Sequence, residues 1–343
     1  MNTYDPADLQ KKTKHEKKKM KEQTKHTPNY GFIMFLVVLV FLLGVCIIEN
    51  PDFKKISLTG SKEASTAYVG VLEVHGTMSS DGTDSSYDQK WLLEQIDDMM
   101  QDKSNKGLML SIDTPGGSVY TVDELYLKIK EYQEATMRPV YAYMESMAAS
   151  GGYYISAPAD KIYANRNCWT GSIGVTVGTV YDISEFLKGL GITTVTITAG
   201  DNKAMGSATE KLTAEQKSIY QGLVDEAYDQ FVDIVAEGRK MNRKRVEGLA
   251  DGRIYTAKQA KANGLIDEIA TREDAVLAMM ADNGLKDCES RVFSYTPEFS
   301  LGNWIFGLTE YFGQSAKGEY DQIMELMQEQ HTFSISYIAK ERK

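Results

Sequence analysis

The sequence has 343 residues, of which 42% are hydrophobic and 25% charged, and its formal net charge is −10 at pH 7. This length and composition are typical of a globular protein with a sizeable core and exclude a largely disordered or fibrous chain. The acidic balance argues against a nucleic-acid-binding protein, so no nucleic-acid partner is expected.

Charge is distributed unevenly along the chain. Residues 1–30 contain eight lysines, no arginine and four acidic residues, whereas the rest of the chain contains 30 basic and 44 acidic residues. A lysine-rich stretch with few apolar side chains does not bury a core. We therefore expect residues 1–30 to form a solvated tail.

An uncharged run, GFIMFLVVLVFLLGVCII, follows at residues 31–48. As an α-helix it would span about 27 Å, which is close to the apolar thickness of a bilayer. A buried core helix would carry a polar face, and a cleaved signal peptide would have a shorter apolar core and a small-residue cleavage site. We therefore expect an uncleaved single-pass anchor. The positive-inside rule then keeps the lysines in the cytoplasm and places the body on the extracytoplasmic side of the cell membrane.

The part of the chain after the anchor is expected to contain a linker at 49–66, a folded domain at 67–290 and a C-terminal extension at 291–343. Apolar patterning in the domain predicts strands that alternate with helices. The predicted strands are 67–74, 107–113, a strand from 139, 161–164, 172–178 and 192–198, and the predicted helices are 88–102, 118–135, a helix from about 150, 213–240 and 271–283. Such alternation is typical of crossover units, so the sequence predicts an α/β fold with a mainly parallel sheet.

A first candidate for chemistry is the turn from Asp113 to Gly117, Asp-Thr-Pro-Gly-Gly, at the end of a predicted strand. Its glycines allow close approach of a ligand, and exposed N–H groups beside a helix start suit an oxyanion hole. The same residues also fit a plain turn between a strand and a helix, and this motif alone favours the plain turn.

A second candidate is SMAASGGYYI at residues 146–155. Ser150 lies at a predicted helix N-terminus, where a serine is either an N-cap or a nucleophile whose oxyanion is stabilised by helix N–H groups. Ser146 is the alternative nucleophile. We prefer Ser150 because two glycines follow it directly and leave room for a substrate backbone.

A serine nucleophile needs a base, and the four histidines offer none in a recognisable arrangement. His15 and His26 precede the anchor, and His75 and His331 lie in no triad motif. A lysine can serve instead when burial lowers its pKa, although composition does not choose among the lysines. The histidines and the three cysteines show no metal-ligand spacing, so we expect no metal and no cofactor.

The stretch from Asp113 to Val175, with SMAASGGYYIS and TGSIGV, resembles the signal peptide peptidase A family of membrane serine proteases, peptidase family S49. The resemblance covers about residues 66–285, and the chain is similar to the short, single-repeat form. It implies the fold of the Clp protease and the crotonases. It also implies peptide substrates, namely remnant signal peptides, and a homo-oligomeric ring, often an octamer, in which a neighbouring subunit supplies the lysine.

The resemblance also implies roles for individual residues. The nucleophile would be Ser150, directly before Gly-Gly, and the general base would be Lys203 in GDNKAMG. Ser172 would orient the lysine. The backbone N–H groups of Gly117 and Gly151 would bind the oxyanion.

The chain departs from the family pattern at several places. Thr114 stands where serine is frequent, and Glu145 stands where many members have a small residue, at a position from which it could alter preference for substrate charge. The C-terminal extension ends in FSISYI at residues 333–338 and a basic tip. This end is either a docking strand or a frayed terminus, or it binds the protein's own cleft, or a neighbour's, like a substrate.

The sequence thus predicts a membrane-anchored serine endopeptidase with a Ser/Lys catalytic dyad. Two alternatives remain. A crotonase-type enzyme acting on coenzyme A thioesters would share the fold but would be expected in the cytoplasm, which the predicted anchor contradicts. A catalytically silent membrane scaffold would need neither Ser150 nor Lys203, and both are present.

Overall fold

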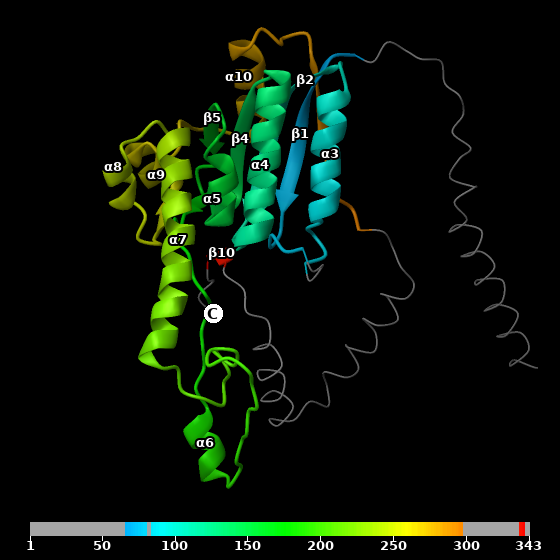
Figure 1. Ribbon diagram of the computed structural model, residues 1–343. Helices are drawn as coiled ribbons and strands as arrows, with labels where there is room; N and C mark the ends of the chain where they lie inside the picture. Colours follow the sequence, from blue (N-terminus) through cyan, green and yellow to red (C-terminus); the bar gives the residue numbers. More distant parts are fainter. Residues whose placement is uncertain (1–65, 81–83, 298–335, 340–343) are drawn as a thin grey trace, which may run out of the picture. The chain divides into compact units, whose positions relative to one another are not determined.

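The computed structural model describes residues 66–80, 84–297 and 336–339 (Figure 1). The chain divides into the units Met1–Ala64 and Ser65–Lys343, and every described residue belongs to the second unit. The predicted tail, the predicted anchor and nearly all of the predicted linker lie outside the described residues. None of the helices in the described ranges is long and apolar enough to span a bilayer.

An eight-stranded sheet forms the centre of the domain. Its order is β7-β6-β4-β2-β1-β9, with β5 beside β4 and β8 beside β5. The strands are β1 (Tyr68–His75), β2 (Asn105–Thr114), β4 (Val140–Ala149), β5 (Lys161–Ala164), β6 (Trp169–Gly171), β7 (Ile254–Thr256), β8 (Glu268–Ile269) and β9 (Glu289–Phe293). All neighbouring strands are parallel except β6 and β7. The α/β fold with a mainly parallel sheet is therefore confirmed.

The described helices are α3 (Gln89–Gln101), α4 (Val119–Thr136), α5 (Gly151–Ser156), α6 (Ser184–Gly189), α7 (Ala214–Gly238), α8 (Arg243–Glu247), α9 (Ala257–Asn263) and α10 (Arg272–Asp282). Polar caps fix where several of them begin: the side chains of Asp88, Ser118 and Thr271 each accept a backbone N–H bond of the first turn. Helices α7 and α9 each begin with a capping box, in which a threonine and a glutamine satisfy each other's backbone.

Helices cover both faces of the sheet. Figure 1 shows α3 and α4 in front of the strands and α10 behind them. Successive strand residues point to opposite faces, so Leu72 and Val74 of β1 belong to the larger core with α3 and α4, whereas Val69 and Val71 pack with Met279 of α10. The apolar side chains of β1 thus contribute to two separate apolar layers, one on each face of the sheet.

Two predicted strands are wrong. Residues 172–178 contain only an isolated bridge at Thr176, and residues 192–198 form no ladder and are exposed. Their alternating β-branched residues favour extended backbone, but a strand also needs a continuous hydrogen-bonded neighbour; in the described chain, the first segment pairs only through Thr176 and the second does not pair with a strand. The predicted strand 161–164, in contrast, coincides with β5.

Candidate active site

The residues predicted to perform chemistry meet at the carboxyl ends of two neighbouring strands. Strands β2 and β4 are parallel and pair as far as Thr114 opposite Ala148. The glycine turn follows β2 directly, and Ser150 follows β4 directly. Because parallel strands end at the same edge, the fold brings together two motifs that are far apart in the sequence.

Ser150 is buried and held in an unusual backbone conformation. It is 1% exposed, with φ 54° and ψ −112°, and its side chain makes no capping bond to α5. Its N–H donates to Gly171 O at 2.7 Å, and its carbonyl accepts from Tyr154 N at 2.9 Å. A non-glycine residue at positive φ costs about 1–3 kcal/mol and persists only where its surroundings impose it. Ser150 therefore occupies the N-cap position of α5 without capping the helix through its side chain, and a residue strained in this way is typical of a functional site.

The backbones of the glycine turn and of the α5 start are in close contact. A Cβ on Gly151 would lie 3.0 Å from Gly116 Cα and 3.2 Å from Gly117 N. A Cβ on Gly117 would lie 1.8 Å from Met78 O, so only glycine fits there. The structure thus places the predicted oxyanion donors, Gly117 and Gly151, next to each other and next to Ser150.

The hydroxyl of Thr114 forms hydrogen bonds that hold the glycine turn. This buried oxygen accepts a bond from Gly116 N at 3.0 Å and donates to Gly76 O. A serine hydroxyl could make the same bonds, which explains why the departure from the family pattern at this position is mild.

A segment of the C-terminal extension lies along the glycine turn. Strand β10 (Ser336–Ile338) pairs antiparallel with β3 (Gly116–Ser118), with Tyr337 opposite Gly117. On its other edge, Ser336 exchanges two backbone bonds with Thr176, at 3.0 and 3.2 Å. Figure 1 shows β10 in red directly below α5. The segment therefore occupies the position of an added strand, which is a common mode of peptide recognition.

The side chain of Tyr337 is buried against α5 and α7. It is fully buried, its ring lies 4.9 Å from that of Tyr154 and 5.0 Å from that of Phe231, and its hydroxyl donates to Ala227 O at 2.9 Å. A Cβ on Gly116 would lie 1.9 Å from Tyr337 O and 2.6 Å from Gly151 N. The carbonyl of this tail residue is therefore beside a predicted oxyanion donor.

The structure brings Ser172, but not Lys203, close to the other predicted site residues. Ser172 has φ 49°, is 9% exposed, and directly follows Gly171, the residue that binds Ser150 N. Lys203 lies in an exposed turn, where its N–H donates to Gly200 O at 3.1 Å. Between the described atoms of Lys203 and Ser150 there is no hydrogen bond.

An ion-pair cluster, which the sequence did not reveal, lies on the α10 face of the sheet near the same edge. Glu145 Oε1 accepts from Ser111 Oγ at 2.6 Å and lies 3.3 Å from His75 Nε2. Arg272 Nη1 lies 2.8 Å from Glu73 and 3.7 Å from Glu145. The bond to Glu145 raises the pKa of His75, and the bond to His75 lowers the pKa of Glu145. Glu145 therefore has charged partners within the domain.

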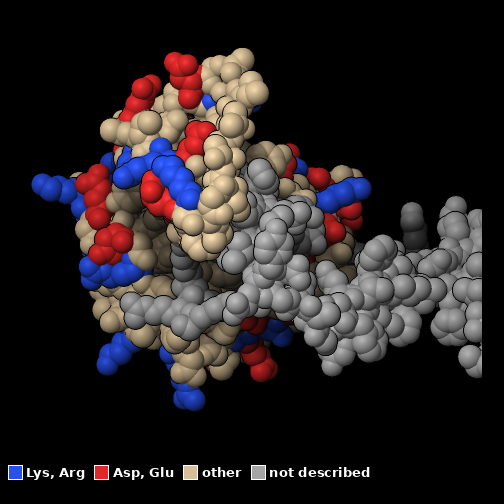
Figure 2. All heavy atoms as spheres, turned by 90° about the horizontal axis from the view of Figure 1, so that it is seen from below, with Lys and Arg blue, Asp and Glu red and all other residues tan. Residues whose placement is uncertain are grey.

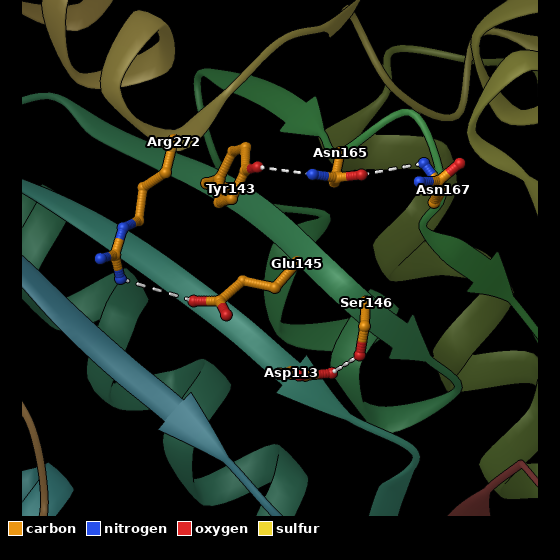
Figure 3. Close-up of a pocket in the computed structure, with 7 residues that line it drawn as sticks. All are labelled: Asp113, Tyr143, Glu145, Ser146, Asn165, Asn167 and Arg272. Carbon is orange, nitrogen blue, oxygen red and sulfur yellow. Dashed lines mark hydrogen bonds and ion pairs between the residues drawn. The ribbon is translucent and has the colours of Figure 1, made fainter.

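The carboxylates and the histidine of this cluster could be mistaken for a metal centre. Glu73, His75 and Glu145 offer ligand atoms within 4.8 Å of one another. The Arg272 guanidinium pairs with both carboxylates and His75 pairs with Glu145, so we interpret the group as an ion-pair cluster. An open pocket adjoins it (Figure 3), lined by Asp113, Tyr143, Glu145, Ser146, Asn165, Asn167 and Arg272.

The two described cysteines, Cys168 and Cys288, are free thiols. Cys168 is fully buried, and burial raises its pKa to about 12. A thiol with so high a pKa is a poor nucleophile, so Cys168 does not compete with Ser150 for that role.

Comparison with known proteins identifies the family. The model of peptidase family S49 matches residues 132–286. A protein of Methanocaldococcus jannaschii that is named as a protease is 33% identical over 285 residues, which cover 82% of this chain and 89% of that protein. A protein of Enterococcus faecium with the name signal peptide peptidase SppA is 37% identical over 229 residues, which cover 65% of this chain and 66% of that protein.

Two further similarities are more distant. The chloroplastic serine protease SPPA of Arabidopsis thaliana is 30% identical over 275 residues, which cover 76% of this chain and 40% of that protein. A ClpP1 mutant from Listeria monocytogenes has a TM-score of 0.41 and 14% identity, with 60% of this chain and 94% of that chain covered. On the sequence relatives and the family match, the chain belongs to peptidase family S49, the family of the signal peptide peptidases A, and is a serine peptidase.

Proposed function

We propose that the chain is a membrane-anchored serine endopeptidase that uses Ser150 and Lys203 to degrade remnant signal peptides and other peptides on the extracytoplasmic side of the membrane. One observation carries the proposal: a buried serine at positive φ begins α5 beside the closely packed backbones of Gly117 and Gly151. Backbone donors beside a serine are what stabilises the oxyanion of acyl transfer, and a strained backbone is frequent at functional sites.

In the proposed reaction, the neutral amine of Lys203 accepts the proton of Ser150 Oγ as this oxygen attacks the scissile carbonyl. The N–H groups of Gly117 and Gly151 stabilise the tetrahedral oxyanion. Protonated Lys203 then donates its proton to the leaving amine, and the acyl-enzyme forms. Water, deprotonated by the same lysine, hydrolyses this ester and restores Ser150.

This reaction needs a second copy of the chain. Lys203 is exposed and makes no described bond to Ser150. The segment around it exposes apolar side chains of the kind that subunit contacts bury: Tyr181, Phe186, Leu190, Ile192, Val195 and Ile197. We therefore place Lys203 in the site of a neighbouring subunit, within a homo-oligomeric ring, with an octamer as the expected size.

A hollow beside Ser172 offers a route for the incoming lysine. It is lined by Ser172, Gly174, Val175, Thr176, Tyr228, Ala250, Asp251 and Gly252. Ser172 lines this hollow and directly follows Gly171, whose carbonyl binds Ser150 N. In the proposed assembly, Ser172 accepts a bond from the neighbour's amine and directs its lone pair toward Ser150.

The groove occupied by β10 is the proposed peptide-binding groove. Substrates would add as an extended strand between β3 and Thr176, and backbone bonds would hold them with little regard to sequence. The bilayer is the second expected partner, through the predicted anchor at 31–48. Nucleic acid is not expected: on the part of the surface that Figure 2 draws in colour, Lys and Arg side chains are interspersed with Asp and Glu rather than gathered in a basic field.

The alternatives are less well supported. Relatives named as proteases argue against an enzyme acting on coenzyme A thioesters. A silent scaffold would not need a strained serine near Gly117, a position where an added Cβ would clash with backbone.

Hydrolysis of a fluorogenic peptide by the full chain in detergent tests the proposal. We expect Ser150→Ala and Lys203→Ala to be inactive, whereas Lys211→Ala, a change at another exposed lysine of the same segment, should retain activity. Oligomer size and melting temperature are compared in all variants. Activity in Ser150→Ala would refute the mechanism, and activity in Lys203→Ala would show that the base is another group.

A further inference from the structure

Strand β4 is irregular shortly before it ends. Against β2, its register changes from Ile112 opposite Met144 to Thr114 opposite Ala148. Strand β4 therefore uses four residues where β2 uses two. Residues 145–147 form a bulge, a feature that redirects a strand and the side chains that follow it.

The other edge of β4 changes its neighbour at the same place. Strand β5 pairs with β4 as far as Met144, and β6 pairs with it from Met147 onward. The first part of β4 thus pairs with β5 on this edge, and the last part pairs with β6. The position of Ser150, three residues after Met147, depends on how the bulge is held.

A single carboxylate oxygen holds the bulge. Asp113 Oδ1 accepts the Ser146 hydroxyl at 2.6 Å and the Met147 backbone N–H at 2.9 Å. Figure 3 shows Asp113 reaching Ser146 from the end of β2. The Asp113 backbone is itself tied to β1, because its carbonyl accepts from Gly76 N at 3.1 Å. The alternative nucleophile Ser146 is therefore engaged by Asp113 and is not at the start of α5.

We propose that Asp113 is a positioning residue that fixes the nucleophile relative to the oxyanion donors; this inference rests on the proposed role of Ser150. Asp113 lies four residues before Gly117 on one strand, and Met147 lies three residues before Ser150 on the next. The bond from Met147 N–H to the Asp113 carboxylate therefore links the strand end that leads to Gly117 with the strand end that leads to Ser150. A misplacement of about 1 Å between reacting groups can cost roughly a hundredfold in rate, so this link acts on kcat.

In this proposal Asp113 acts by accepting two hydrogen bonds and not by its negative charge. Substitutions can separate these two properties. Asp113→Asn keeps an oxygen that can accept both bonds and removes the charge. Asp113→Glu keeps the charge and moves the oxygen by one methylene, and Asp113→Ala removes both. With the full chain and a fluorogenic peptide, we expect Asp113→Asn to stay within about threefold of the wild-type kcat. We expect Asp113→Glu and Asp113→Ala to lose at least about tenfold in kcat, with KM within about threefold.

A matched control separates positioning from general strand stability. The Asp160 carboxylate accepts Val140 N at 2.9 Å, so it holds the opposite end of β4 in the same way. Asp160→Ala should lower the melting temperature and leave kcat unchanged.

Three results would overturn the inference: wild-type kcat in Asp113→Glu or in Asp113→Ala, an equal loss of kcat in Asp113→Asn and Asp113→Ala, or a loss of kcat in Asp160→Ala equal to that in Asp113→Ala. Ser150→Ala is measured in parallel. If it is inactive while Asp113→Ala is fully active, only the positioning role fails. If it is active, the proposed mechanism fails as well.

Discussion

Tyr337 of the C-terminal segment lies directly opposite Gly117 of the glycine turn in an antiparallel pair. A tethered peptide has an effective concentration on the order of millimolar, so it competes strongly with free peptides. Deletion of the residues after 332 should therefore raise kcat/KM for short peptides several-fold, as measured by fluorogenic hydrolysis. Unchanged activity would show that the segment does not restrict the groove.

The point variant Tyr337→Ala gives an independent test of the same contact. It removes a fully buried aromatic side chain, which weakens docking of the segment, so it should also raise activity. Tyr120→Ala is the matched control, because this tyrosine is 67% exposed on α4. Equal effects of the two substitutions would contradict a specific role of the buried Tyr337 side chain.

Exposure of Lys203 predicts complementation between inactive subunits. When Ser150→Ala and Lys203→Ala chains are co-expressed and assemble at random, about a quarter of the sites should combine an intact serine with a neighbour's intact lysine. Peptide hydrolysis by the mixed assembly should therefore return to about that fraction of the wild-type rate. Each variant assembled alone serves as the control, and a mixed assembly without activity would mean that serine and lysine act within one subunit.

Gly117 has no room for a side chain. A Cβ there would lie 1.8 Å from Met78 O, so Gly117→Ala must displace the turn, and we expect loss of peptide hydrolysis together with a lower melting temperature. Gly222→Ala is the control, because Gly222 lies in α7 with nothing within 4 Å of an added Cβ. This helical substitution should be neutral or stabilise the fold by up to about 1 kcal/mol. Normal hydrolysis by Gly117→Ala would exclude the turn from the site.

The pair of His75 and Glu145 should make stability depend on pH. The folded-state pKa of His75 is raised from 6.5, so its contribution is fully present below pH 6.5 and is lost as pH rises through the raised value. The pKa of Glu145 is lowered from 4.5, so its contribution is present above that pH and is lost in acid. The melting-temperature difference between wild type and His75→Gln should therefore be larger at pH 6 than at pH 9. An equal difference at both values would contradict the pairing.

The sequence could predict features that depend on local pattern. The strand at 161–164 was predicted at the position of β5. The contact between the backbones of Gly117 and Gly151 follows from the fold, and their role as oxyanion donors stays a prediction. The strand predicted at 192–198 is wrong because propensity does not supply a partner strand. The β4 bulge and the bonds of Glu145 could not be predicted, since they depend on which side chains the sheet register places together.

The catalytic roles of Ser150 and Lys203 stay predictions. The structure of a single chain contains the surroundings of Ser150, but it does not contain the proposed surroundings of Lys203. The surroundings of Ser150 come from its own strand and its neighbours, which the single chain contains. The surroundings of Lys203 in the proposed site come from another copy. A sequence motif can identify such a lysine without indicating which subunit's serine it serves.

The parallel direction of β1, β2 and β4 sets the distance between the start of the described domain and Ser150. The described chain begins at Thr66, just before β1, at the edge of the sheet where these strands start, whereas Ser150 lies at the edge where they end. The eight residues of β1 separate the two edges by about 26 Å. Thr66 therefore lies on the side of the domain away from Ser150. A peptide held near Thr66 would have to pass along the full depth of the sheet before it reached Ser150.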